Sequence, residues 1–528
     1  MPQRSALNWP PGFPESLDYP EVPVGAIVFG AANRFGDRTA FARGGAELSY
    51  ARLAGSAAQL ANSLVAAGVR PGDRVALRMP NCLEYPVAYY GVLLAGAVFV
   101  PVNPLLPEPA AVAQIADAGA VRVILAADVA GLCEGRSETP PNVAIDVHND
   151  LAHLAYTGGT TGVSKGVRLP HRNVVVNALQ YACWGTGSLP AVDSAGGVLV
   201  DQVGPAEEWP VRHGSGIAIN LTPWFHAMGT IAGLNAPMLT GTTLVLHDRL
   251  DPAAYLADAE RLRVTSMGGA PALFAALLSC PDIDKRDLSS LRGIGSGAAP
   301  MPMEMSRRLY ELAPDAVITE GYGLTEVTMG ATSGPSHRSG VRKIGTVGVP
   351  VFDTQVRIMP ADESGGDPLP AGERGEVCIS GPQVMLGYHN RPEATAEVLA
   401  DGWLRTGDIG VLDDEGYLSI VDRKKDMLLY KGYNVYPREL EELLAAHDGV
   451  LAAAVVGKPD TAVGELPVAF VVPARPNLTA DEVLSAVNDQ VVAYKKLREV
   501  YFVDQIPVSA AGKILKRELR ARLTGSAG

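Results

Sequence analysis

Strand-like and helix-like segments alternate along this chain from about residue 48, and this alternation limits the folds that it can adopt. The segment SYARLAGSAAQLANSLVAAG (49–68) has Ser49 as a helix N-cap, leucines on one side of the helix and Gly68 as a stop signal. DRVALRM (73–79) and VFVPVN (98–103) follow and are apolar enough to be buried strands. This βαβ pattern predicts an α/β fold with a largely parallel sheet.

The chain length of 528 residues exceeds what one hydrophobic core usually serves. Strand and helix signals return after residue 430, with Pro437 at a first helical position and a capping box formed by Thr479 and Glu482. A charged stretch, VDRKKDMLLYKGYNVYP (421–437), lies between the two regions. We therefore expect a large N-terminal domain over 1–424, with parallel and mixed sheets layered with helices, and a small α+β domain over 425–528.

Composition narrows the classes of partner and the compartment. A formal net charge of −13 argues against a nucleic-acid partner, which requires a basic surface. Five scattered cysteines without a CxxC pair favour a reducing, cytoplasmic location. The apolar stretch 89–106 is interrupted by Pro101 and Asn103, so we expect a buried helix followed by a strand and no membrane span. Residues 185–216 show no sustained period and are expected to be an excursion from the large domain.

A loop rich in glycine and hydroxyl groups, YTGGTTGVSKGV (156–167), follows the apolar run at 151–155. Such a loop can direct backbone N–H groups at a phosphate while its lysine supplies charge. The Walker A spacing is absent, because Lys165 is followed by glycine. Residues 162–166 do fit GxSxG, the nucleophile elbow of serine hydrolases, but several residues separate Ser164 from the predicted strand. We therefore favour a phosphate-binding loop, with a hydrolase as the weaker alternative.

Four further motifs occur in a fixed order with this loop: GYGLTE (321–326), WLRTGD (403–408), DRKKDMLLYKGYNVYP (422–437) and SAAGKILKREL (509–519). Together they resemble the adenylate-forming (ANL) superfamily, in its branch of AMP-forming acyl-CoA synthetases. The resemblance extends from about residue 48 to Lys516. It implies that ATP, Mg²⁺ and CoA are used in two steps, in which a carboxylate first forms an acyl-AMP and a thiol then accepts the acyl group.

The resemblance assigns nucleotide-binding roles to residues in several motifs. Tyr322 would pack against adenine, Thr325 would contact the α-phosphate, and Glu326 would bind Mg²⁺, a cation that prefers carboxylate oxygen. Asp408 would accept hydrogen bonds from the ribose hydroxyls, with Arg423 beside it. The other nucleotide contacts implied are the loop residues Thr157, Thr160, Thr161, Ser164 and Lys165, the adenine wall Gly297, Ala298 and Ala299, and Gly321.

The same resemblance makes Lys513 the first candidate for catalysis, since its ammonium group would bridge the substrate carboxylate and the α-phosphate. The basic residues that follow it are expected to face solvent: Lys516, Arg517, Arg520 and Arg522. Between half-reactions the C-terminal domain would rotate about Lys425. Lys431, Gly432 and Asn434 would then line the tunnel for CoA.

The resemblance places the acyl site around LTPWFHAMGT (221–230), where His226 would lie beside the carboxylate. Members of the family that activate amino acids carry an aspartate in this segment to bind the α-ammonium group. No aspartate occurs here, so an α-amino acid is not the expected substrate. The other predicted pocket residues are small or adaptable, namely Trp224, Met228, Gly268, Gly269 and Met329. We predict a roomy hydrophobic pocket for a fatty, arylalkanoic or polycyclic acid.

The function expected from the resemblance is that of an acid–thiol ligase that acts on a carboxylic acid, ATP and CoA. No carrier-protein segment follows residue 516, so the acceptor is expected to be free CoA or a separate carrier protein. An enzyme that runs mainly one half-reaction and a non-catalytic adenylate-binding protein stay open. The assembly state also stays open, with a homodimer as one possibility.

Overall fold

The chain forms two units, each with its own sheets and core. The structure, a computed structural model, describes residues 8–157, 164–299, 301–361, 366–431, 433–508 and 514–524. The large unit comprises Met1–Val356, Ile379–Leu404 and Glu415–Tyr417, and the small unit comprises Arg357–Cys378, Arg405–Asp414 and Leu418–Gly528. The small unit thus includes segments that precede Lys425. This grouping describes packing and does not locate a hinge, so the boundary at Lys425 stays a prediction.

A nine-stranded mixed sheet forms much of the large unit, in the order β16-β15-β14-β13-β12-β10-β11-β1-β2. The strands from β1 through β11, β10, β12 and β13 to β14 are parallel neighbours, and β2, β15 and β16 are antiparallel additions at the two ends. The bounds are β1 (Thr39–Arg43), β2 (Ala46–Ser49), β10 (Ile217–Asn220), β11 (Thr243–Leu246), β12 (Ser266–Gly269), β13 (Gly293–Ser296), β14 (Val317–Tyr322), β15 (Thr332–Ser333) and β16 (Val349–Pro350).

A second sheet of the large unit has the order β5-β3-β4-β6-β7. Its strands are β3 (Arg74–Leu77), β4 (Val98–Pro101), β5 (Ala120–Ile124), β6 (Leu151–Thr157) and β7 (Lys165–Pro170). Helix α2 (Tyr50–Ala66) begins after Ser49, whose side chain accepts a hydrogen bond from the Arg52 N–H, as predicted. Helix α3 (Glu84–Leu94) precedes β4, which confirms a buried helix and strand at 89–106. Among the described residues, no helix is long and apolar enough to cross a membrane.

The irregular stretch 185–216 is largely a two-stranded hairpin. Helix α6 (His171–Thr186) leads into β8 (Ser188–Val192), which pairs antiparallel with β9 (Val198–Gln202). Trp209 follows the hairpin and is buried, with its ring against Phe13 and His337. This segment therefore packs against the large unit through aromatic rings. The contacts join residues far apart in the sequence, so they produce no local hydrophobic period.

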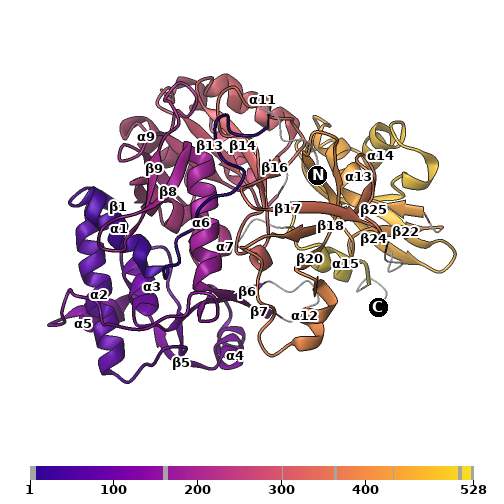
Figure 1. The fold of residues 1–528 in the computed structure, drawn as a ribbon. Helices are drawn as coiled ribbons and strands as arrows, with labels where there is room; N and C mark the ends of the chain where they lie inside the picture. The colour runs from indigo at the N-terminus through magenta and orange to yellow at the C-terminus, as the bar shows by residue number, and fades with distance from the viewer. Residues whose placement is uncertain are drawn as a thin grey trace. The chain divides into compact units, whose positions relative to one another are not determined.

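The small unit has a sheet of five strands whose two faces are covered by different helices (Figure 1). Alternate residues of β24 (Val450–Asp460) and β25 (Gly464–Pro473) pack with α13 (Pro437–Ala445) and α14 (Ala480–Asn488) on one face. The other face receives α15 (Lys516–Thr524). Pro437 begins α13 and the Thr479 side chain caps α14, as predicted. The remaining strands of this sheet are β22 (Leu428–Tyr430), β23 (Tyr433–Val435) and β26 (Glu499–Phe502).

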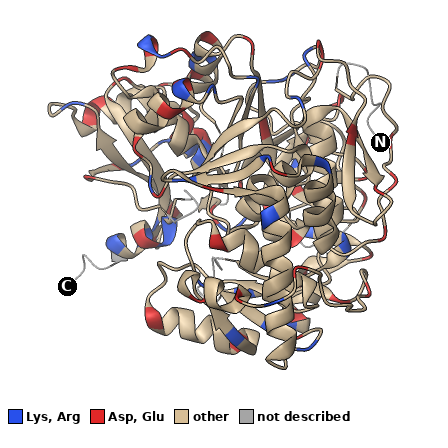
Figure 2. Ribbon diagram, turned by 90° about the vertical axis from the view of Figure 1, so that its left-hand side faces the viewer, with Lys and Arg blue, Asp and Glu red and all other residues tan. Residues whose placement is uncertain are grey.

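A further sheet of the chain includes β18 (Arg374–Ser380), β20 (Trp403–Leu412) and β21 (Leu418–Arg423), and β21 pairs antiparallel with β20. Acidic and basic residues are interspersed along the described helices, including the C-terminal helix α15 (Figure 2). The fold class is thus an α/β large domain with parallel and antiparallel strands and a smaller α+β C-terminal domain, as the sequence predicts.

Candidate active site

The predicted phosphate loop lies between two paired strands. Strands β6 and β7 are antiparallel up to the pair Thr157 and Lys165, and the Ser164 hydroxyl donates to the Thr157 carbonyl. Thr160 and Thr161 lie outside the described residues. A nucleophile elbow requires a helix directly after its serine. Ser164 is instead followed by a strand and its hydroxyl is bonded to the backbone, so the structure does not support the hydrolase alternative.

Tyr388, which lies in none of the motifs described above, connects two of the predicted site residues. The Tyr388 hydroxyl donates to Glu326 Oε1 at 2.8 Å, and the Lys165 ammonium lies 4.8 Å from the centre of the Tyr388 ring. At that separation the cation is attracted to the ring face. The predicted phosphate-binding lysine therefore contacts the ring of Tyr388, and the predicted metal-binding glutamate accepts a hydrogen bond from its hydroxyl.

Tyr388 is held in place by its own backbone. It forms an antiparallel bridge with Val167 of β7, and its N–H donates to Thr395 Oγ1 at 2.9 Å. The side chain is buried, and burial followed by the charge of Glu326 raises the pKa of Tyr388. The hydroxyl thus stays protonated as a donor to the carboxylate. The only local signal was an aromatic residue in the loop LGYHNRP (386–392), which is too common a pattern to select.

The chemistry of Glu326 fits Mg²⁺. One of its oxygens accepts from Tyr388, and the neighbouring chain is fixed because the Met385 N–H donates to the Glu326 carbonyl at 2.8 Å. No cluster of three or more ligand side chains occurs among the described residues. Mg²⁺ at nucleotide sites is usually held by one or two carboxylates together with substrate phosphates and water. A single oriented carboxylate beside a phosphate loop meets this requirement.

The carboxyl ends of β12, β13 and β14 bring the predicted adenine wall and acyl segment together. Gly268 pairs with Gly295, and a Cβ added to Gly297 would lie 3.7 Å from Met228 Sδ and 3.6 Å from the Gly321 carbonyl oxygen. Ala298 has a φ of +67°, an uncommon conformation for a residue with a side chain. Strained backbone of this kind is concentrated at binding and active sites. Ala299 is the next residue in the same turn.

Space remains beside part of this wall. A Cβ on Gly268 would approach only the Gly295 carbonyl oxygen, at 4.0 Å, whereas one on Gly269 would press on the Leu273 side chain. Gly268 is exposed and Gly269 is buried. Gly268 therefore offers volume to a ligand, while Gly269 serves the packing of the strand against its helix.

The GYGLTE motif changes from strand to helix within a few residues. Tyr322 ends β14 opposite Thr332, and Thr325 and Glu326 lie in a 3-10 turn (Thr325–Val327). Gly323 lies between Tyr322 and Thr325, and a Cβ on it would overlap the carbonyl of Met329. Glycine is required at this close approach, and it places the Thr325 and Glu326 turn next to the segment that contains Met329.

His226 stands at the start of a short helix that continues as a π-helix. It precedes α7 (Ala227–Thr230), which runs into the π-helical turn η1 (Ile231–Asn235). The Thr230 hydroxyl lies within hydrogen-bond distance of the carbonyl oxygens of Trp224 and His226, at 2.7 and 3.1 Å. Turns of this type are frequent at functional sites. The Thr230 hydroxyl thus holds the backbone on both sides of Phe225 and next to His226 by hydrogen bonding.

A buried polar network continues from Thr230 toward the phosphate loop. Asn235 donates to the Thr230 carbonyl at 2.8 Å and to the Tyr89 hydroxyl at 2.9 Å. That hydroxyl lies 2.9 Å from Nε2 of His153, on the strand that leads into the loop. Burial lowers the pKa of His153 to about 3, so the ring is neutral. The network connects the acyl segment to β6, a link that no motif indicates.

Trp224 differs from the other predicted acyl-pocket residues. Its ring is fully buried, with its centroid 5.5 Å from Phe41 and 5.4 Å from Tyr85, and its Nε1–H donates to the Gly233 carbonyl at 2.9 Å. The ring therefore serves the core in this structure. A part for Trp224 in the acyl pocket stays a prediction.

Two predicted ribose contacts lie side by side in the small unit. Asp408 and Arg423 are partners across β20 and β21, and Arg423 Nε lies 3.5 Å from Asp408 Oδ1. The Asp408 N–H donates to the Thr406 hydroxyl oxygen at 3.1 Å. The carboxylate is oriented by a strand and a neighbouring cation, which suits an acceptor for a diol.

Lys425 occupies an exposed turn between β21 and β22, flanked by the buried acids Asp422 and Asp426. Asp422 Oδ2 accepts from the Arg438 N–H at 3.0 Å, and the Arg438 guanidinium donates to the Ile420 carbonyl. The end of β21, just before the turn, is thus hydrogen-bonded to the start of α13. The rotation about Lys425 stays a prediction.

Two of the predicted CoA-tunnel residues, Lys431 and Asn434, belong to the β-hairpin of β22 and β23. Lys431, with a φ of +53°, follows β22, and Asn434 lies opposite Leu429 on β23. Both side chains are exposed. Gly432 and the candidate catalytic Lys513 lie outside the described residues.

Four basic residues that follow Lys513 were expected to face solvent, and this prediction is wrong for Lys516, whose side chain is only 11% exposed and pairs with Glu441. It is also wrong for Arg520, which is half-buried against Asp426. Arg517 and Arg522 are exposed as expected.

Comparison with known families places most of the chain in two matches. Residues 28–389 match the family described as AMP-binding enzyme, and residues 439–513 match the AMP-binding enzyme C-terminal domain. A feruloyl-CoA synthase from Amycolatopsis sp is 38% identical over 502 residues, which cover 92% of this chain and 96% of that relative. A long-chain-fatty-acid–CoA ligase from Bacillus subtilis is 32% identical, with 97% of this chain and 96% of the relative covered.

Solved structures agree with the sequence matches. The crystal structure of ATP-bound MatB from Rhodopseudomonas palustris superposes with a TM-score of 0.83 at 28% identity, and covers 96% of this chain and 100% of that one.

Proposed function

Because this chain belongs to the family of AMP-binding, adenylate-forming enzymes, we propose that it joins a hydrophobic carboxylic acid to CoA with ATP, through an acyl-AMP. The observation that carries the proposal is the link from Lys165 through Tyr388 to Glu326, which fixes a cation and a carboxylate beside the loop between β6 and β7. Relatives named as CoA synthases and ligases support the same reaction class.

In the proposed first step, the carboxylate attacks the α-phosphorus and pyrophosphate leaves. Lys165 and the loop hydroxyls would bind the departing phosphates, and Thr325 would contact the α-phosphate. Mg²⁺, held by the free oxygen of Glu326, would offset phosphate charge. Asp408 and Arg423 would orient the ribose, and Lys513 would reduce the repulsion between the carboxylate and the phosphate.

In the second step, a thiol attacks the acyl carbon and AMP leaves. We propose that residues 425–528 act as a lid that turns about Lys425 between the two steps. The exposed hairpin tip with Lys431 and Asn434 would then approach the pantetheine arm, where Gly432 leaves space. The exposed turn around Lys425 supports this assignment, because a hinge must change its backbone angles without disturbing a core.

The acid is proposed to be large and apolar, either aromatic or fatty. The space beside Gly268 and the nearby Met228 thioether support a roomy pocket. The two relatives act, by name, on feruloyl and long-chain fatty acyl groups, which are both larger than acetate. A cytoplasmic location is proposed from the five free cysteines, three of which are buried.

The test is a panel of acids with ATP, Mg²⁺ and CoA, read by mass spectrometry for acyl-AMP and acyl-CoA. Cinnamic acids, long-chain fatty acids, acetate and amino acids form the panel, and acid-dependent exchange of pyrophosphate into ATP reports the first step alone. Acyl-CoA from an aromatic or fatty acid supports the proposal, and acyl-AMP without acyl-CoA points to a separate carrier protein as the acceptor. A lack of acid-dependent AMP or exchange with every acid would refute it.

Two variants separate the steps. Lys513→Ala should lower pyrophosphate exchange by at least two orders of magnitude and leave the transfer from supplied acyl-AMP largely intact. Replacing Gly432 with tryptophan should do the reverse, because the side chain would fill the proposed tunnel.

A further inference from the structure

The described residues on either side of 509–513 pair with each other. Val508 and Ile514 form an antiparallel bridge, and the Leu515 N–H donates to the Pro507 carbonyl at 2.9 Å. Lys513 lies outside the described residues, but it is bonded to Ile514, and adjacent Cα atoms are about 3.8 Å apart. Whatever holds Ile514 and the helix after it therefore limits where the Lys513 side chain can reach.

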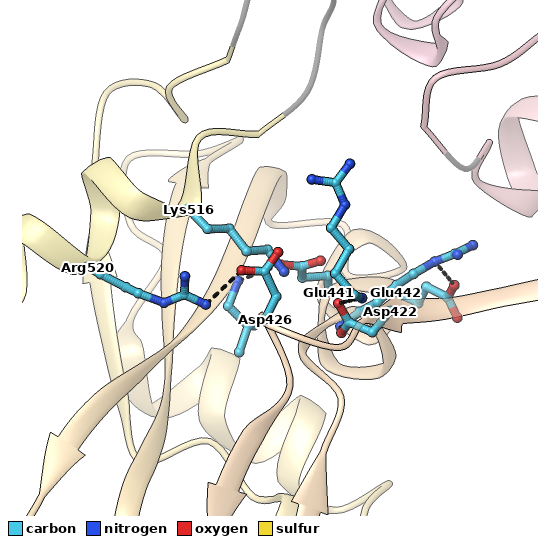
Figure 3. A network of polar contacts seen from close by, with 9 residues as sticks. Asp422, Asp426, Glu441, Glu442, Lys516 and Arg520 are labelled. Carbon is cyan, nitrogen blue, oxygen red and sulfur yellow. Dashed lines mark hydrogen bonds and ion pairs between the residues drawn. The ribbon is translucent and has the colours of Figure 1, made fainter. Parts of the chain in front are cut away.

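Helix α15, which follows this segment, is held by the apolar packing of Leu519 and Leu523 and by two ion pairs (Figure 3). Leu519 is fully buried in a cluster with residues of β24 and β25. On neighbouring turns, Lys516 Nζ lies 2.9 Å from Glu441 Oε1 and Arg520 Nη2 lies 2.8 Å from Asp426 Oδ1. One helix is thus fastened to α13 and to the turn before β22.

Burial makes these pairs more than surface contacts. The side chains of Lys516 and Glu441 are 11% and 17% exposed, and that of Asp426 is 13% exposed. Glu441 Oε1 also accepts from the Val455 N–H at 2.8 Å, and burial raises the pKa of Glu441 while the Lys516 charge opposes the rise. Removing one member of such a pair leaves a buried charge without compensation, so the helix must shift or open.

Both acids lie on the same side of the proposed hinge as the helix. Asp426 directly follows Lys425, and Glu441 lies on α13 beyond it. A rotation at Lys425 would therefore carry Asp426, Glu441 and α15 together, with both pairs intact. The distance from the hinge to the start of α15 would then be the same in each orientation of the lid.

We propose that Lys516 and Arg520 are positioning residues, which fix the start of α15 to the hinge-side turn and to α13 so that Lys513 arrives in register when the lid closes for adenylation. This inference rests on the proposed function. It predicts that loss of either pair affects the half-reaction that uses Lys513 and spares the half-reaction that does not.

The first test measures docking in the free enzyme, by hydrogen–deuterium exchange of peptides within 514–524. Arg520→Gln and Lys516→Met should raise amide exchange there by about tenfold, because α15 opens more often. Arg517→Gln is the matched control, since it removes the same charge from an exposed position on the same helix. Unchanged exchange in both pair variants would overturn the proposal.

The second test compares the two half-reactions, using the acid of the panel with the fastest pyrophosphate exchange. Arg520→Gln should lower exchange about tenfold to a hundredfold, since a misplacement of about 1 Å can cost a hundredfold. Acyl-CoA formation from supplied acyl-AMP should stay within about twofold. Arg520→Lys should recover part of the pyrophosphate exchange, because a lysine can still pair with Asp426. Asp426→Asn added to Arg520→Gln should cause little further loss of pyrophosphate exchange, because the pair is already broken.

Equal losses in both half-reactions would overturn the positioning role, because they would indicate general destabilisation. Pyrophosphate exchange at the wild-type rate in the pair variants would overturn the positioning role as well. Failure of the proposed function looks different, since the wild-type enzyme would then show no acid-dependent exchange, while the deuterium measurement would still report whether the pairs hold α15.

Discussion

The Tyr388 hydroxyl can be removed without changing the shape of its ring, so Tyr388→Phe tests the link between Glu326 and Lys165. The change deletes the 2.8 Å hydrogen bond to Glu326 Oε1 and leaves the ring under the Lys165 ammonium. The Glu326 carboxylate then loses the donor that fixes its orientation. We expect a weaker response to Mg²⁺ and little change in phosphate binding by Lys165.

The size of the effect follows from the type of bond. A hydrogen bond to a charged group contributes about 1.5–3 kcal/mol, which corresponds to about tenfold to 150-fold in an equilibrium constant. Groups that orient a metal ligand typically change metal affinity about tenfold to a hundredfold. The two figures agree on a rise of at least tenfold in the Mg²⁺ concentration needed for half-maximal activity.

The assay is acid-dependent pyrophosphate exchange at fixed ATP, with Mg²⁺ varied. For Tyr388→Phe the Mg²⁺ curve should move to higher concentration and reach a maximum within about threefold of wild type. Because burial raises the pKa of Tyr388, the shift should be the same at neutral and mildly alkaline pH.

Tyr156→Phe is the matched control. It also removes one hydroxyl–carboxylate hydrogen bond, of 2.7 Å to Asp117, from a tyrosine of β6, the strand that pairs with β7. If Tyr388→Phe has the Mg²⁺ dependence of wild type, or if Tyr156→Phe shifts it equally, Tyr388 does not orient the Glu326 carboxylate.

Three further predictions concern the framework of the site. Asn235→Ala should lower the free energy of unfolding in urea by about 2–4 kcal/mol, because buried partners lose their hydrogen bonds. Acidification from about pH 8 to about pH 5 should lower the free energy of unfolding by about 2 kcal/mol through His153. The pKa of His153 is 6.5 in the unfolded chain and about 3 in the folded protein, so only the unfolded chain takes up the proton in this range. His153→Gln should remove this part of the pH dependence. Gly323→Ala should lower the midpoint of thermal unfolding by several degrees and abolish exchange, because its Cβ would overlap the Met329 carbonyl.

Features that depend on a few adjacent residues could be predicted from the sequence. Ser49 and Thr479 cap helices because their side chains reach backbone N–H groups three residues away, and Pro437 suits the first turn of a helix whatever surrounds it. The family resemblance likewise assigned the segments of Met228, Gly297 and Gly321 to one site, and these residues do lie close together.

Features that depend on pairing between distant segments could not be predicted. Tyr388 and Glu326 are separated by 62 positions, and Asn235 and Tyr89 by 146. No local period relates such residues, and one tyrosine or asparagine is too common to stand out. Lys516 was expected in solvent for the same reason, since a run of basic residues near a chain end gives no sign of an acid on another helix.

The hydrogen bonds from Arg438 to Asp422 and Ile420 join residues on opposite sides of Lys425. A lid that turns at Lys425 must open them, and each is worth about 0.5–3 kcal/mol. The protein would then prefer one lid orientation before any ligand binds, and only a ligand with a larger difference in affinity between the orientations could reverse that preference. The order in which ATP, acid and CoA engage would thus be set partly by hydrogen bonds at the start of α13.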